Sequence, residues 1–149
     1  MDRPKVLVVA GYDQSAGAGV LSDIKTLEAH RVYGYGVCTG ITFQNETAVR
    51  RVDWLRLEDI TAQIDLCYES SGFSWVKMGI TPSAKVAAAI IDHLRLRNPA
   101  IKVILDPVIR SSSGADFWGA TPQLEWEALA ARCYLVTPNW EEIEWLYPA

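Results

Sequence analysis

The hydrophobic pattern changes from strand-like to helix-like within the first 28 residues. Residues 6–10 form a short apolar run rich in β-branched side chains, and this run breaks at Gly11. Apolar side chains then recur at Val20, Ile24 and Leu27, which is the spacing of one helix face. The sequence therefore predicts a buried strand, a small polar loop and a helix that begins directly after the loop.

The same alternation continues to the end of the chain. Five further apolar runs have the length of strands: 35–43, 49–55, 74–78, 101–105 and 134–136. The run at 49–55 is expected to be more exposed than the others. Four segments fit helices: 57–68, 82–97, 122–132 and one that begins at Trp140. Strands that alternate with helices of this length are typical of a mostly parallel sheet with helices on both faces. The predicted fold class is α/β.

The first loop has the composition of a small-molecule site. Residues 11–19 include three glycines and two alanines, so little side-chain bulk is present. Backbone N–H groups are therefore expected to face a polar or anionic ligand, helped by the positive end of the helix dipole. A turn that only reverses the chain is the alternative. No P-loop motif occurs, and Gly17 and Gly19 lack the third glycine of a dinucleotide fingerprint.

Polar side chains gather where the predicted strands end. Seven of them lie at or just after such an end: Asp13, Asp23, Gln44, Lys77, Asp106, Asn139 and Glu142. Ligands of parallel α/β sheets bind at the carboxyl ends of the strands, so these residues are expected to converge on one rim. The alternative is that they only begin loops and cap helices.

Composition narrows the classes of function. The 149 residues suit one domain, and 50% hydrophobic residues suffice for a substantial core. A net charge of −4 without a basic cluster argues against nucleic-acid binding. No apolar stretch approaches ~20 residues and no signal-peptide pattern occurs, which predicts a cytoplasmic protein. His30 and His93 are expected to be surface histidines. Cys38, Cys67 and Cys133 are expected to be buried, reduced thiols.

Six motifs occur in a family-specific order along the chain. They are AGYDQSAGAG, SDIKT, VYGYGVCTGITFQN, VKMGI, ILDPV and VTPNWEE. In this order they resemble the hydroxymethylpyrimidine and phosphomethylpyrimidine kinases of thiamine biosynthesis, which have the ribokinase-like fold. The resemblance implies a three-layer α/β/α sandwich, in which residues 1–149 form the N-terminal part of a single kinase domain that assembles as a homo-oligomer, a dimer.

The resemblance also implies a reaction and a substrate pocket. The reaction is the ATP-dependent phosphorylation of the hydroxymethyl group, or of the phosphate added there, of 4-amino-5-hydroxymethyl-2-methylpyrimidine. By position, Gly11, Asp23 and Gln44 would hold the aminopyrimidine, and Ile80 and Val108 would form the pocket wall. A planar heterocycle with donor and acceptor edges needs such a carboxylate and amide, because an ill-matched analogue leaves them unpaired.

A second set of residues is assigned to the phosphates by the same resemblance. Asp106, Asn139 and Glu142 would lie beside the phosphates of ATP, with Asp106 and Glu142 as ligands of Mg²⁺. Oxygen ligands suit this hard cation, and phosphoryl transfer depends mainly on alignment and charge neutralisation.

The sequence departs from the family in one major respect. Family members carry a Gly-Thr-Gly stretch followed by Asp or Cys, which supplies an anion hole and the catalytic base, and these 149 residues contain no such stretch. The chain corresponds to a little over half of a family member and is expected to be truncated and inactive alone. Two alternatives stay open, a pyridoxal kinase, which shares DPV and TPN-x-x-E, and a pyrimidine-binding remnant without catalysis.

Overall fold

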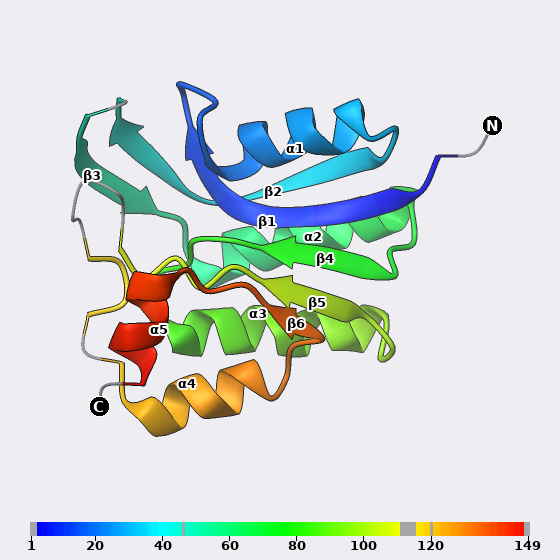
Figure 1. Cartoon of the computed structure of the whole chain (residues 1–149). Coiled ribbons are helices and arrows are strands. Elements are labelled where there is room, and N and C mark those ends of the chain that lie inside the picture. The colour runs from blue at the N-terminus through cyan, green and yellow to red at the C-terminus, as the bar shows by residue number, and fades with distance from the viewer. Residues whose placement is uncertain (1–2, 46, 111–115, 120, 148–149) are drawn as a thin grey trace.

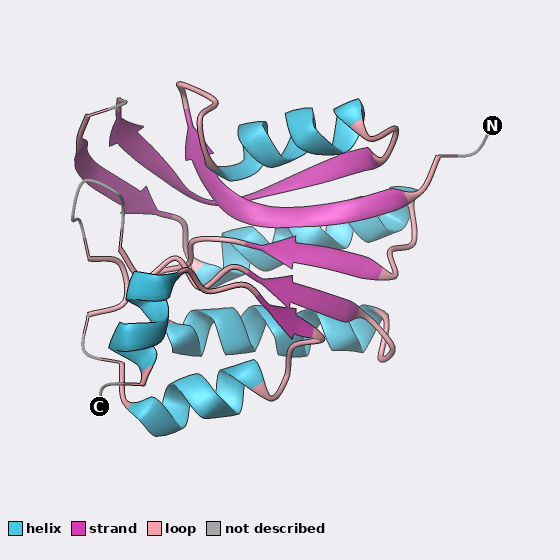
Figure 2. Cartoon of the chain, in the orientation of Figure 1, coloured by secondary structure: helices cyan, strands magenta, loops and turns pink. Residues whose placement is uncertain are grey.

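The computed structural model describes residues 3–45, 47–110, 116–119 and 121–147. Within these ranges the chain forms one six-stranded sheet and five helices (Figures 1 and 2). The strands are β1 (Lys5–Asp13), β2 (Tyr33–Gln44), β3 (Val49–Trp54), β4 (Trp75–Met78), β5 (Lys102–Leu105) and β6 (Leu135–Val136). The helices are α1 (Gly19–Ala29), α2 (Leu57–Ser70), α3 (Ala84–Arg97), α4 (Gln123–Ala130) and α5 (Trp140–Leu146).

The sheet is mostly parallel, as the alternation predicted. The strand order is β3-β2-β1-β4-β5-β6, and β1, β2, β4, β5 and β6 run parallel to their neighbours. Only the edge strand β3 is antiparallel, because it returns from β2 as a hairpin. The carboxyl ends of five strands therefore meet at one edge of the sheet.

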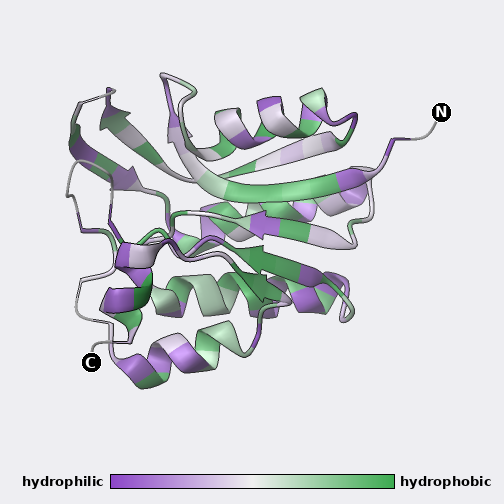
Figure 3. Cartoon of the chain, in the orientation of Figure 1, coloured by the Kyte–Doolittle hydropathy of each residue, from purple (hydrophilic) through white to green (hydrophobic). Residues whose placement is uncertain are grey.

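Helices cover both faces of the sheet, which confirms the layered sandwich. Neighbouring side chains of β1 point to opposite faces, so Leu7 and Val9 join the main core cluster while the equally buried Val8 does not. Helix α1 packs over β1 and β2, and α2 packs under β2 and beside α3 (Figure 1). The hydropathy colouring places hydrophobic stretches in β1 and β5 and hydrophilic ones in the edge strand β3 (Figure 3).

The main core lies between the sheet and helices α2, α3 and α4. Ala84 and Ala87 of α3 are buried in this core, and Ile90, Ile91 and Leu94 are fully buried on the same face of the helix. Removing this apolar surface from water supplies the main driving force for the fold. None of the described helices has the length and apolar character needed to cross a membrane.

Strand β1 is longer than the predicted run at 6–10. It continues through Gly11 to Asp13 because β2 provides partners for it, with Tyr12 opposite Ile41 and Asp13 opposite Thr42 after a shift in register. The Thr42 hydroxyl also donates to the Tyr12 carbonyl at 2.9 Å. Gly11 therefore belongs to a strand, and the loop begins only after Asp13.

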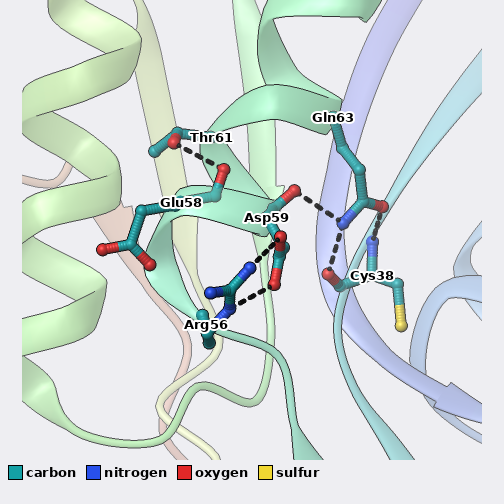
Figure 4. A network of polar contacts seen from close by, with 6 residues as sticks. All are labelled: Cys38, Arg56, Glu58, Asp59, Thr61 and Gln63. Carbon is teal, nitrogen blue, oxygen red and sulfur yellow. Dashed lines mark hydrogen bonds and ion pairs between the residues drawn. The ribbon is translucent and has the colours of Figure 1, made fainter.

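Helix α2 is hydrogen-bonded to β2 just before the hairpin that leads to β3. The side-chain amide of Gln63 accepts from the Cys38 N–H at 2.9 Å and donates to the Cys38 carbonyl at 3.1 Å (Figure 4). At the start of α2, both nitrogens of the Arg56 fork donate to Asp59, at 2.9 and 3.0 Å. This network fixes the strand that carries Gln44 at its end.

Candidate functional site

A cavity of about 580 Å³ opens at the carboxyl edge of the sheet. Strands β1 and β2, helix α1 and the segments after β4 and β5 all contribute to its wall. Six of the residues assigned from the sequence line it, together with Lys77: Gly11, Asp23, Gln44, Ile80, Asp106 and Val108. Asn139 and Glu142 are not among the lining residues. Of the seven polar residues expected to converge on one rim, five therefore do so: Asp13, Asp23, Gln44, Lys77 and Asp106.

The loop between β1 and α1 is organised by its own carboxylate. The side chain of Asp13 accepts from the backbone N–H groups of Ser15, Gly17 and Ala18, at 2.9, 3.2 and 2.9 Å, and from the Ser15 hydroxyl at 2.8 Å. The expectation that these N–H groups face a ligand is therefore wrong, because an internal anion already occupies them. The loop is a rigid support for the cavity.

Electrostatics keep the Asp13 side chain ionised. Only 3% of the residue is exposed, and this burial by itself would raise the pKa of the carboxyl group. Hydrogen bonds from the Ser15 N–H, the Gln44 side chain, the Ser15 hydroxyl and the Ala18 N–H outweigh burial, so the pKa of Asp13 lies below its ordinary value. Since Gln44 is one of these donors, Asp13 also holds the amide at the cavity wall.

Two glycines allow α1 and the segment after β4 to approach β1. Gly19 has φ +62°, and a Cβ there would lie 2.1 Å from the Gly11 carbonyl oxygen. A Cβ at Gly11 would lie 2.3 Å from Cδ1 of Ile80. The close approach places Asp23, just over one turn into α1, at the cavity, and it lets Ile80 form part of the wall as the sequence suggested.

A lysine joins the two ends of the cavity. Nζ of Lys77 lies 2.7 Å from Oδ2 of Asp23 and 3.7 Å from Oδ2 of Asp106. Sequence reasoning placed Lys77 at a strand end but did not include it in the site. The available signal was its position in β4 between Val76 and Met78, which are both fully buried in the main core. Alternation alone sends Lys77 to the opposite face, where α1 carries Asp23.

Asp106 is a carboxylate of the cavity with a raised pKa. It follows β5, and its backbone N–H donates to the Met78 carbonyl at 2.8 Å, which fixes the turn. Burial raises the pKa of Asp106, the Lys77 charge opposes this, and the Asp23 charge adds to it, so the pKa lies above its ordinary value. A cation placed beside Asp106 would relieve that cost.

Asn139 and Glu142 form the capping box of α5. The Asn139 side chain accepts from the Glu142 N–H at 2.9 Å, and the Glu142 carboxylate accepts from the Asn139 N–H at 2.8 Å. Glu142 is only 7% exposed. Burial raises the pKa of Glu142, hydrogen bonds from the N–H groups of Asn139 and Ile109 oppose this, and the nearby charge of Asp106 adds to it.

The carboxylates of Asp106 and Glu142 are of the kind that a hard cation prefers. Within the described ranges, no group of three or more His, Cys, Asp or Glu side chains is arranged to hold a metal ion. Mg²⁺ in phosphotransferases, however, commonly takes one or two carboxylates, with phosphate oxygens and waters completing the octahedron. Asp106, whose charge raises the pKa of Glu142, and Glu142 itself provide that number of carboxylates.

The histidines and cysteines lie outside the cavity wall. His30 ends α1 and is exposed, as expected for a surface histidine, whereas His93 is half-buried and contacts Asp65 at 2.7 Å. All three cysteines are free, but they are half-buried and not fully buried. Burial raises the pKa of Cys133 to about 11, so this thiol is inert at neutral pH.

Comparisons with known proteins agree on one family. The family model for phosphomethylpyrimidine kinase matches residues 13–148. A hydroxymethylpyrimidine/phosphomethylpyrimidine kinase from Staphylococcus aureus strain N315 is 32% identical over 146 residues, which is 97% of this chain. The chain spans 52% of that relative's own length.

Solved structures share the architecture. A phosphomethylpyrimidine kinase from Clostridium difficile 630 is 32% identical with a TM-score of 0.80, covering 99% of this chain and 64% of that one. A pyridoxal kinase from Staphylococcus aureus, solved with pyridoxal, is 24% identical with a TM-score of 0.78, covering 98% and 54%. The second likeness shows a common fold only. Because the family model covers most of its length, the chain belongs to the phosphomethylpyrimidine kinase family.

Proposed function

We propose that the cavity binds 4-amino-5-hydroxymethyl-2-methylpyrimidine and that the whole protein phosphorylates its hydroxymethyl group from ATP. One observation carries the proposal: Asp23 from α1 and Gln44 from β2, 21 positions apart in the sequence, line the same cavity, and Asp106 lines it too. A pocket with an amide, a carboxylate and an aliphatic wall suits a small aminoheterocycle.

The chemistry of the two polar side chains matches the substrate. In our proposal the exocyclic amine donates to the Asp23 carboxylate or to the Gln44 carbonyl oxygen, and the Gln44 amide donates to a ring nitrogen. The Gln44 side chain is held from behind, because Asp13 accepts from its amide. The Gln14 side chain donates to the backbone carbonyl of Gln44. A preorganised amide loses less freedom on binding, which favours affinity. Ile80 and Val108 would cover the faces of the ring.

We assign the phosphate end of the transfer to Asp106, which lines the cavity, and to Glu142 and Asn139 of α5, which do not line it. The hydroxymethyl oxygen would form a bond to the γ-phosphorus while the bond to the β,γ-bridging oxygen breaks and ADP leaves. Mg²⁺ held by Asp106 and Glu142 would supply charge neutralisation at the phosphates, and Asn139 would hold Glu142 in place through the capping box. We assign the proton acceptor for the hydroxyl to none of these 149 residues, and we propose a cytoplasmic location, which three free thiols support.

Calorimetry with two ligands tests the substrate. The aminopyrimidine and pyridoxal are titrated separately into the chain, and the pyrimidine is expected to bind more tightly. Asp23→Ala should weaken pyrimidine binding by about 1–3 kcal/mol through lost polar contacts. Asp92→Ala, which breaks an exposed ion pair to Arg132, is the matched control and should leave the affinity unchanged. Tighter binding of pyridoxal, or an unaltered affinity of Asp23→Ala, would refute the assignment.

A further inference from the structure

Lys77 is the one cation that contacts carboxylates of both ends of the cavity among its described lining residues. It reaches Asp23 on α1 and Asp106 after β5, two residues that are 83 positions apart in the sequence. The side chains are 28%, 23% and 36% exposed for Lys77, Asp23 and Asp106. At this partial burial, the interaction is screened less than an exposed ion pair but is still reached by water.

The geometry leaves one oxygen of Asp23 for a ligand. Lys77 donates to Oδ2 at 2.7 Å, whereas Oδ1 has no hydrogen-bond donor within the part of the chain that the structure describes. Gly79 lies beside the ammonium, since a Cβ placed on it would be 3.4 Å from Nζ, an ordinary contact distance. The contact therefore fixes the rotation of the carboxylate and directs the other oxygen elsewhere in the cavity.

The Lys77 ammonium also offsets the negative charge of Asp106, at the end of the cavity that we assign to the phosphates. Lys77 Nζ is 3.7 Å from Asp106 Oδ2, where a positive charge opposes the approach of a second cation. Asp23 in turn adds a negative charge to the neighbourhood of Asp106. The two ends of the cavity are therefore connected through one side chain.

We propose that Lys77 is a positioning residue that holds Asp23 for the aminopyrimidine and weakens the hold of Asp106 on Mg²⁺, so that both ends of the cavity are coupled. The first half of this inference rests on the proposed substrate, and the second half rests on the proposed Mg²⁺ site at Asp106. Loss of the ammonium frees the Asp23 carboxylate to rotate, and it also removes a positive charge beside Asp106. Pyrimidine affinity should fall while Mg²⁺ affinity rises.

Opposite changes separate a positioning role from a merely structural one. A residue that only supports the fold would weaken both ligands when it is replaced. The test uses Lys77→Met, the charge-preserving Lys77→Arg and the control Lys85→Met, whose lysine is exposed and pairs with Glu125 outside the cavity wall. Circular dichroism and thermal unfolding first establish that each variant is folded, and calorimetry then measures the aminopyrimidine and MgCl₂ separately.

Lys77→Met is expected to bind the pyrimidine about tenfold more weakly, as for the loss of one charge-assisted contact, and Mg²⁺ several-fold more tightly. Lys77→Arg should restore both affinities to within about threefold of the original chain, because it keeps the charge. Lys85→Met should change neither. In a double-mutant cycle, Asp23→Asn and Lys77→Met should be non-additive for pyrimidine binding, since they break one contact.

Mg²⁺ binding that is unchanged or weaker in Lys77→Met overturns the coupling, and additive losses in the cycle overturn the role in holding Asp23. If Lys77→Met does not fold, Lys77→Gln takes its place with the same expected results. A chain that binds Mg²⁺ but no pyrimidine refutes the proposed function, and the Mg²⁺ measurements then still decide the effect of Lys77 on Asp106.

Discussion

Two carboxylates at the carboxyl edge of the sheet have opposite environments. Asp13, at the end of β1, is almost fully buried and accepts four hydrogen bonds from its own loop, and its pKa is lowered. Asp106, after β5, is partly exposed to the cavity and has the Lys77 ammonium as its partner at 3.7 Å, and its pKa is raised. The hydrogen bonds of the first strand–helix loop are thus satisfied without a ligand, whereas a cation beside Asp106 would stabilise the carboxylate that follows β5.

The difference indicates how this site divides its tasks. The first loop supplies shape, since it fixes the position of α1 and of the Gln44 amide. The ends of β4 and β5 supply the charged side chains of Lys77 and Asp106, whose interactions a ligand can still change. Preorganised walls with a few convergent polar groups are the usual composition of a small-molecule pocket. Substitutions in the first region should therefore mainly affect stability, and substitutions in the second should mainly affect binding.

The largest stability effect is expected at the junction of the first loop with α1. Gly19→Ala would combine a left-handed backbone with a Cβ 2.1 Å from the Gly11 carbonyl oxygen, and it should lower the free energy of unfolding by about 3 kcal/mol or more. Gly119 is the matched control, because it has φ +57° with open space around it. Gly119→Ala should cost only about 1 kcal/mol. Equal losses in urea unfolding would show that the close approach is unimportant.

A somewhat smaller loss is expected for Asp13→Asn. This change removes the negative charge of the carboxylate, which accepts hydrogen bonds from the N–H groups of Ser15, Gly17 and Ala18. It should lower the free energy of unfolding by about 2 kcal/mol. Asp53→Asn, which breaks an exposed pair with Arg51, should change stability by less than about 0.5 kcal/mol. Chemical denaturation of both variants measures the contrast, and a similar small loss in both would contradict the supporting role of Asp13.

The contribution of Asp13 should also depend on pH. Its pKa is lower in the folded chain than in the unfolded one, where an aspartate titrates at about 3.9, so the ionised form favours folding. The stability gap between the original chain and Asp13→Asn should be constant above about pH 5 and should shrink as the pH falls below about 4. Unfolding experiments from pH 7 to pH 3 measure this gap. A gap that stays constant to the lowest pH would mean that the charge of Asp13 contributes nothing.

The smallest effect on stability is expected from the same substitution at the other end of the cavity. The raised pKa of Asp106 means that its ionised form is less favourable in the folded chain, so Asp106→Asn should leave the free energy of unfolding within about 0.5 kcal/mol or increase it. Its Mg²⁺ affinity should fall by at least tenfold, as measured by titration calorimetry. A large loss of stability without a change in Mg²⁺ binding would reverse the contrast between the two regions.

The order of strands and helices could be predicted because hydrophobic periodicity is a local property. Helix α3 is an example, since Ser83 caps it as a polar residue at a helix start would, and Asn98 and Pro99 end it. The extension of β1 to Asp13 could not be predicted in this way. It depends on pairing with Ile41 and Thr42, about thirty residues further along the chain.

The candidate site shows the same limit. Asp23, Gln44 and Asp106 were found because strand ends and family motifs mark them, and the cavity brings them together. The occupation of the loop N–H groups by Asp13 was missed, since composition does not reveal where a side chain folds back. The pattern N-x-x-E at Asn139 suggests phosphate binding and also fits a capping box, and sequence alone does not separate these uses.

A crystal structure of the chain with the aminopyrimidine bound would show whether Asp23 and Gln44 hold the ring. We expect the ring between Ile80 and Val108, with its amine and a ring nitrogen within hydrogen-bond distance of Asp23 and Gln44 and its hydroxymethyl group directed toward Asp106. A ligand seated in another part of the molecule, or Asp23 and Gln44 turned away from the ring, would contradict it.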